Sequence, residues 1–271
     1  MVFGAVHHFI VDMIRHRELL RSLAAKEFKV RYKNAVLGFL WTILNPLLLM
    51  LVLTFVFRIM GARFGDMDPG KYPAFVLCGL IPWTFMAHSL SQSTASLLDN
   101  ASLIRKIYFP REIIPLSSIL ANFVNFLLSL VVLFFFLLAS ELTPSVWMFA
   151  VPLIVVAELM FVMGISLIGS SLNAFYRDVA YIVEAVLLVW WWGTPIFYSP
   201  EIVENAVSPR MYSIYMANPM AAVVVSLRQI LLERRFPDVS LIVTLFAGAI
   251  LSFVVGVVIF RRRQGVIADF V

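Results

Sequence analysis

The sequence consists of long intervals without charged residues, separated by short clusters of Lys, Arg, Asp and Glu. The cleanest intervals are residues 34–57, 72–98, 113–140 and 239–260, each of 22 to 28 residues. An α-helix needs about 20 apolar residues to cross a bilayer, because each residue advances it by about 1.5 Å. With 62% hydrophobic and 14% charged residues, the chain lacks the polar surface of a water-soluble domain. The sequence therefore predicts an all-α polytopic membrane protein.

Two further intervals are interrupted by one charge each, residues 142–176 by Glu158 and residues 179–200 by Glu184. We therefore predict six transmembrane helices within a domain of residues 34–260. Their approximate bounds are 36–58, 73–97, 113–139, 146–173, 179–198 and 239–260. The segment 200–235 has a charge-free run too short to cross comfortably, and Asn218-Pro219 interrupts it. We interpret it as re-entrant or as short gate helices between spans 5 and 6.

The distribution of Lys and Arg supports this count. Six spans place fourteen of the 21 basic residues on one side, in residues 1–33, the linker 99–112, the loop after span 4 and the tail 261–271. A seventh span would put the basic tail across from the basic N-terminus. The positive-inside rule thus predicts that both termini are cytoplasmic. Apolar residues recur every three or four positions in residues 9–28, which indicates an amphipathic helix on the membrane surface or a simple basic flank.

Several motifs of enzyme chemistry do not occur. The sequence has no G-x-x-x-x-G-K-[S/T], H-E-x-x-H, C-x-x-C or G-x-S-x-G, and its one cysteine, Cys78, excludes an internal disulfide. We therefore predict no enzyme activity, catalytic residue, metal or cofactor in this chain, so that any energy for work comes from another protein. Asp66 and Asp68 could form the metal-binding pair of a glycosyltransferase, but a solvated turn before Pro69-Gly70 is the simpler interpretation.

The two acids within predicted spans need an explanation, because a carboxylate at mid-membrane costs about 2.5–3.5 kcal/mol. Glu158 and Glu184 could form a proton or cation relay, as in a secondary transporter. The alternative is a structural hydrogen bond or a position beside a water-filled cavity. Glu184 follows Arg177-Asp178 closely, so we expect it near the cytoplasmic interface.

Aromatic residues gather on spans 1, 2 and 5. The candidates are Phe39, Trp41, Trp83, Phe85, Trp190, Trp191, Trp192, Phe197 and Tyr198. Consecutive helical residues differ by about 100°, so three successive Trp spread over about 200° and at least one avoids lipid. The set fits an interfacial aromatic belt. It also fits a stacking path for sugars, because apolar ring faces let a polymer slide without fixing its register.

The linker after span 2 mixes basic residues with an apolar surface. Ile104, Ile107, Tyr108 and Phe109 lie among Arg and Lys on the predicted cytoplasmic side. A plain loop rarely carries this much apolar surface, so we expect a short helix that docks on a partner.

Several stretches, in order along the chain, resemble the membrane subunit of bacterial ABC-2-type polysaccharide exporters. They are RYKNAVLGFLW at residues 31–41, LNPL at 44–47, FPREIIP at 109–115, NAFYRD at 173–178, TPIFY at 194–198 and NP at 218–219. No single stretch is specific, but the ordered set is. Ala35 departs from the serine that the family often has, which puts little in doubt.

The resemblance implies a homodimer of six-span permeases with two copies of a separate ATPase, which binds the ATP and Mg²⁺. The expected substrate is a polysaccharide, O-antigen first, on a polyprenyl diphosphate lipid, exported across the bacterial inner membrane. The ATPase-coupling residues would be Leu103, Ile104, Arg105, Lys106, Ile107, Tyr108, Phe109 and Pro110. Lys26, Lys29, Arg31 and Lys33 would hold the lipid diphosphate at a portal, or simply attract anionic membrane lipid. Segment 200–235 would gate the periplasmic mouth, and no nucleic acid is expected as a partner.

Three alternatives remain open at this stage. The chain could be an ABC-2 permease for drugs or other small hydrophobic molecules. It could be a membrane glycosyltransferase that uses Asp66 and Asp68. It could also be a proton-coupled transporter that uses Glu158 and needs no ATPase.

Overall fold

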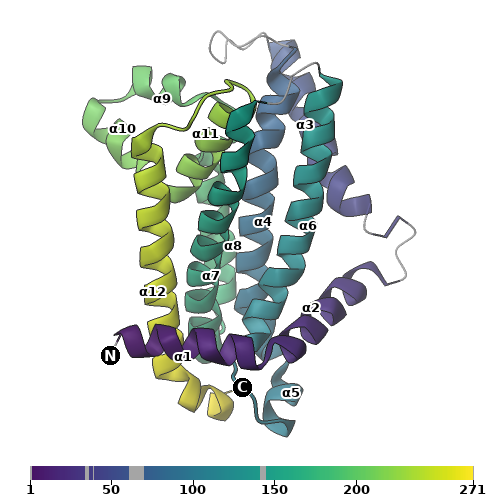
Figure 1. Ribbon diagram of the computed structural model, residues 1–271, viewed down its shortest axis with the longest axis vertical. Helices are drawn as coiled ribbons and strands as arrows, with labels where there is room; N and C mark the ends of the chain where they lie inside the picture. Colours follow the sequence, from purple (N-terminus) through teal and green to yellow (C-terminus); the bar gives the residue numbers. More distant parts are fainter. Residues whose placement is uncertain (1, 34–36, 39, 61–69, 141–144, 271) are drawn as a thin grey trace.

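The protein is a helical bundle with short helices at both ends. The computed structural model describes residues 2–33, 37–38, 40–60, 70–140 and 145–270, and all regular elements in these ranges are helices. They are α1 (Val2–Arg15), α2 (Arg17–Tyr32), α3 (Leu40–Met60), α4 (Tyr72–Asp99), α5 (Ala101–Lys106), α6 (Ile113–Ala139), η1 (Val146–Ala150), α7 (Val151–Phe175), α8 (Val179–Trp192), α9 (Pro200–Ala206), α10 (Pro209–Met216), α11 (Pro219–Leu231) and α12 (Val239–Phe270). We call the end crossed by α1 the α1 end, and the opposite end the α9 end (Figure 1). The all-α prediction is confirmed.

Five helices in the described residues are long and apolar enough to cross a membrane. They are Leu40–Phe57, Tyr72–Asp99, Ile113–Ala139, Val146–Phe175 and Val239–Ile267. Each occupies an interval that the charge pattern predicts as a span. The multi-pass membrane architecture therefore follows from the same absence of charge that defines the intervals.

The fifth predicted span, 179–198, differs from the others. There α8 has 14 residues and ends at Trp192, with Gly193 as its C-cap. Pro195 follows, and proline has no N–H with which to extend the helical ladder. At about 1.5 Å per residue, α8 is about 21 Å long, shorter than a hydrocarbon core of about 30 Å. Residues 193–198 are therefore not helical, and the count of six spans stays a prediction.

The segment interpreted as re-entrant contains a sharp bend. Helices α10 and α11 meet at an angle of 85°, and Asn218 caps the first turn of α11. Pro219 packs beside Gly248, well inside α12, whereas Gln229 donates to Asp238 just before α12 at 2.7 Å. The α11 helix thus begins inside the bundle and ends at the α9 end. This geometry agrees with a re-entrant pair rather than a crossing.

The core is built around α4, most of whose residues are buried, and which packs on α3, α6, α7, α8 and α11. The α7 and α12 helices approach very closely at two glycines. A Cβ on Gly256 would lie 2.3 Å from the carbonyl oxygen of Gly164, so only glycine fits there. Small residues allow such close packing of membrane helices. By contrast, only 11% of the residues in the membrane-spanning part of α3 are buried, and this helix presents an apolar face to its surroundings.

Candidate functional site

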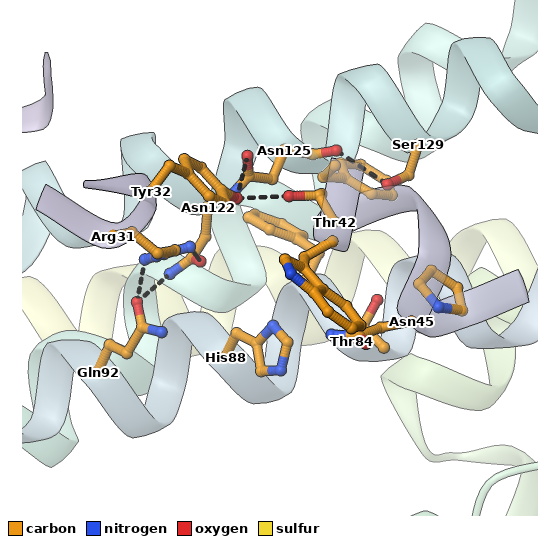
Figure 2. A pocket seen from close by; sticks show the side chains of 14 residues that line it. Arg31, Tyr32, Thr42, Asn45, Thr84, His88, Gln92, Asn122, Asn125 and Ser129 are labelled. Atoms are coloured by element: carbon orange, nitrogen blue, oxygen red, sulfur yellow. Dashed lines mark hydrogen bonds between the residues drawn. The ribbon is translucent and has the colours of Figure 1, made fainter. Parts of the chain in front are cut away.

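A polar cavity of about 330 Å³ lies between α2, α3, α4 and α6 (Figure 2). Its lining residues are Arg31, Tyr32, Trp41, Thr42, Asn45, Pro46, Thr84, Phe85, His88, Gln92, Asn122, Asn125, Phe126 and Ser129. Most of these side chains carry hydrogen-bonding groups, which are costly to place in an apolar bundle without partners. A concave site with a few converging polar groups is the first candidate for ligand binding.

The guanidinium of Arg31 forms a hydrogen-bonded ring with two side-chain amides. Its Nη1 donates to Oδ1 of Asn122 at 2.6 Å, and its Nη2 donates to Oε1 of Gln92. The amide of Asn122 also donates to Oε1 of Gln92, at 3.0 Å. Arg31 belongs to the last turn of α2, Gln92 to α4 and Asn122 to α6 (Figure 2). The ring therefore joins three helices across one side of the cavity.

A second set of hydrogen bonds fixes the neighbouring side. The hydroxyl of Tyr32 donates to Oδ1 of Asn125 at 3.1 Å and is hydrogen-bonded with the hydroxyl of Thr42. Ser129 donates in turn to the backbone oxygen of Asn125 at 3.0 Å. These bonds connect the end of α2 with α3 and α6, so that α2 is held over the cavity.

The electrostatics of the cavity favour an anion. Its fourteen lining residues, all within the described part of the chain, include no Asp or Glu. The partners of Arg31 in the ring are neutral amides, so none of them neutralises its positive charge. A guanidinium with planar donors suits phosphate or carboxylate oxygens. The surrounding amides and hydroxyls can both donate and accept, as sugar hydroxyls require.

The four predicted portal cations do not all reach this cavity. Arg31 lines it, whereas Lys26, Lys29 and Lys33 are exposed on α2 and at its C-cap. The exposed lysines lie along the helix that leads to Arg31. The predicted surface helix of residues 9–28 is helical in α1 and α2, and its place on a membrane stays a prediction.

The predicted aromatic residues separate into two groups. Trp41 and Phe85 line the cavity, and the Phe85 ring stacks on Phe126 with 4.8 Å between centroids. Phe39 lies outside the described residues. The hydrogen-bonded side chains around Arg31 and the apolar faces of Trp41 and Phe85 therefore line the same cavity.

The second aromatic group lies where α8 and the segment after it meet α4. Its members are Trp83, Trp190, Trp191, Trp192, Phe197 and Tyr198. Trp83 makes edge contacts with Trp190 and Trp191, with 6.1 and 5.6 Å between centroids. Trp190 and Trp191 therefore pack against protein, and the role of the Trp run in a glycan path stays a prediction. Trp192 is 63% exposed and packs its edge against Phe197, so it is the tryptophan of the run most open to a passing molecule.

The predicted ATPase-coupling residues form a protrusion at the α1 end (Figure 1). Ile104 and Phe109 are buried and Leu103 and Pro110 half-buried, so these four anchor the segment. The other four, Arg105, Lys106, Ile107 and Tyr108, are exposed. The Tyr108 side chain is fully exposed, at 100%, and Ile107 is 56% exposed. These adjacent exposed apolar side chains suit a docking site, and the contact with an ATPase stays a prediction.

The acidic residues do not gather into a catalytic constellation in the described part of the chain. Glu158 is fully buried in α7, and neither of its carboxylate oxygens has a hydrogen-bond partner among the described residues. Glu184 is exposed on α8 and accepts from Ser91. Asp66 and Asp68 lie outside the described residues. No group of three His, Cys, Asp or Glu side chains suited to a metal occurs within the described ranges.

Sequence reasoning missed the polar partners of the cavity. Asn122 and Asn125 stand three residues apart on one face of an otherwise apolar helix, and Gln92 is a polar residue within a predicted span. Polar residues in spans are costly and usually face the bundle interior. This spacing could have identified α6 as a cavity-lining helix, but not which residues face it.

Sequence reasoning also missed Arg228. Its position just after the apolar run of the gate segment suggested only a charge that flanks this run. It is buried in α11, with its guanidinium 3.3 Å above the ring of Phe75. Its Nη2 donates to the backbone oxygen of Ile196 at 2.6 Å. Arg228 thus fastens the re-entrant helix to α4 and to the segment that follows α8.

Comparison with known proteins gives one family. The family model described as ABC-2 type transporter matches residues 18–232. A protein of Klebsiella pneumoniae, named O-antigen export system permease protein RfbA, is 34% identical over 249 residues, covering 91% of this chain and 92% of that protein. A protein of the same name from Myxococcus xanthus is 30% identical over 258 residues, covering 95% of this chain and 97% of that protein.

Proposed function

The chain belongs to the ABC-2 type transporter family, and from this premise we propose that it is the permease subunit of an exporter of lipid-linked O-antigen. It is a transport permease rather than an enzyme, as its family indicates. In this proposal the polysaccharide leaves across the bacterial inner membrane on a polyprenyl diphosphate. A separate ATPase subunit supplies the energy.

The observation that carries the proposal is the length of the similarity. The match to proteins named O-antigen export permeases covers more than nine-tenths of both chains. Cavity, coupling segment and re-entrant pair therefore all lie within the shared part. A resemblance confined to one span would support membership of the family and no particular cargo.

The cavity supports a substrate that joins an anion to sugars. Arg31 offers donors that suit a diphosphate, and Asn122, Asn125 and Gln92 offer groups that suit sugar hydroxyls. In this reading the exposed lysines of α2 attract the diphosphate at the membrane surface, and Arg31 receives it. A purely apolar drug would offer no group that interacts with the charge of Arg31, which favours the glycan over a small hydrophobic cargo.

In this proposal a second copy of the chain completes the path for the polymer. The apolar face of α3 and the exposed Trp192 of α8 are surfaces that a second copy can cover. We place the glycan path between two copies, with Trp41, Phe85 and Trp192 offering flat ring faces to the sugars. In the proposed orientation both termini are cytoplasmic, and the bent α10–α11 pair gates the periplasmic mouth of the glycan path.

The exposed face of the coupling segment is the proposed seat of the ATPase. Ile107 and Tyr108 would insert into the ATPase. The buried Ile104 and Phe109 would anchor the segment to the helical bundle, so that a movement of the ATPase moves the bundle too. Two ATPase copies would serve two permeases, and the ATP and Mg²⁺ would be bound by those copies.

The test is stimulation of ATP hydrolysis by defined substrates. The purified permease–ATPase complex, in vesicles, is given the O-antigen on polyprenyl diphosphate, the polyprenyl diphosphate alone, or a panel of hydrophobic drugs. We expect stimulation by the complete lipid-linked glycan and little by the drugs. Stimulation by drugs with no response to the glycan would replace this function by small-molecule efflux.

A further inference from the structure

The α1 end contains a buried ion network that the proposed transport mechanism does not yet use. The guanidinium of Arg261, on α12, donates from one nitrogen, Nη2, to two carboxylates. It lies 2.5 Å from Oδ2 of Asp12 and 2.6 Å from Oε1 of Glu112. Glu112 is fully buried, and the side chain of Arg261 is 14% exposed. Solvent therefore screens this network far less than a surface ion pair.

The three residues come from three functionally different elements. Asp12 lies on α1, the helix across the α1 end, which continues through α2 to Arg31 in the cavity. Glu112 is the N-cap of α6, three residues after Phe109 of the coupling segment. Arg261 thus bonds the N-terminal helices on one side and the coupling segment on the other.

Two more contacts join the coupling segment and α1 to α12. Arg111, beside Glu112, donates to the backbone oxygen of Gln264, one turn after Arg261. On the other side, the Phe9 ring of α1 is buried against Phe253 of α12, with 5.7 Å between centroids. The end of α12 is therefore held at both elements, and Arg261 is the residue that touches both.

The network also has an unused pairing. Nε of Arg261 and Oε2 of Glu112 are buried without hydrogen-bond partners among the described residues. Because the two residues already pair through Nη2 and Oε1, these free atoms allow a second, bidentate arrangement of the same pair. A network with two alternative arrangements is what coupling between distant sites requires.

We propose that Arg261 is a positioning residue that transmits movement of the ATPase-bound coupling segment to α1, and through α2 to the substrate cavity. The inference rests on the proposed function, because it takes the coupling segment as the ATPase contact. Glu112 conveys the movement to Arg261, and Asp12 conveys it onward. Loss of Asp12 therefore separates ATP hydrolysis from export while leaving both partners folded.

The experiment compares Asp12→Ala with wild type in the full permease–ATPase complex. Asp12 is suited to this because its side chain is 31% exposed and its removal leaves the buried Arg261–Glu112 pair intact. We expect complex yield and ATP hydrolysis close to wild type. Glycan exported per ATP should fall about tenfold or more, the loss typical of one charge-assisted hydrogen bond. Asp12→Glu should restore it, because the carboxylate returns within reach of the guanidinium.

Glu18→Ala is the matched control, since it removes the same negative charge from an exposed side chain in the first turn of α2. It should export as wild type does. A fall in Asp12→Ala yield with unchanged export per complex would reduce the network to a structural role and overturn the inference. Normal export by wild type and Asp12→Ala alike would overturn it as well. If the wild-type complex itself exports no O-antigen, the proposed function fails first and the inference falls with it.

Discussion

Replacement of Arg31 by glutamine tests the anion site of the cavity most sharply. The variant keeps a polar side chain of similar reach but loses the charge. Hydrogen bonds to charged groups contribute about 1.5–3 kcal/mol, and each 1.4 kcal/mol is tenfold in affinity. Arg31→Gln should therefore raise the glycan concentration for half-maximal ATPase stimulation by about 10- to 100-fold. The maximal rate should change little, because Arg31 is assigned to binding the diphosphate and not to the contact with the ATPase.

The structure also indicates that this variant folds. The amide of Asn122 donates to Gln92 independently of Arg31, so the two amides keep a partner when the guanidinium is lost. Arg21→Gln is the matched control, because it removes one exposed charge from the same helix, lies outside the group assigned to the diphosphate and should cost no more than about 1 kcal/mol. The assay is ATPase stimulation over a range of lipid-linked glycan at matched protein. An unchanged half-maximal concentration for Arg31→Gln would refute the assignment of the diphosphate to this cavity.

Three further predictions concern other parts of the molecule. Gly256→Val should lower the yield of folded permease, because the valine side chain would overlap the backbone of Gly164 and overpacking costs about 1–3 kcal/mol. A normal melting temperature in detergent would contradict this prediction. Hydrogen bonding from Arg235 lowers the pKa of Asp238, so the ionised acid stabilises the fold above its unfolded pKa of about 3.9, and this stabilisation is lost as pH falls through the lower folded pKa. Asp238→Asn should therefore flatten the dependence of the melting temperature on acid pH. An identical dependence in variant and wild type would contradict this role of Asp238. Tyr108→Asp should reduce copurification of the ATPase while leaving the permease folded, since its side chain is fully exposed, and normal copurification would move the docking site elsewhere.

The membrane helices could be predicted from the sequence because the signal for them is local. A run without charge is sufficient to place a span, and residues 113–139 are helical over the predicted bounds. The end of α8 was also visible, since Gly193 and Pro195 are helix-ending residues, yet the length of the apolar run outweighed them in the prediction. The bend at Asn218-Pro219 was recognised by the same local rules.

The candidate site could be predicted only in part, because its residues meet through packing. Arg31 and Asn122 are 91 positions apart, and Asp12 and Arg261 are 249 apart, so no spacing rule connects them. The coupling segment was identified by its composition, but the sequence treats Tyr108 and Phe109 alike. The structure distinguishes them, because one turns outward and the other packs into the bundle.

The most direct test of the account is to delete the gene and to locate the lipid-linked O-antigen by fractionation and blotting. The account predicts that O-antigen accumulates inside on its polyprenyl carrier, that none reaches the surface, and that the intact gene restores surface display. Unchanged surface O-antigen in the deletion strain would contradict the account at its centre, and loss of glycan from both places would indicate a role in synthesis instead of export.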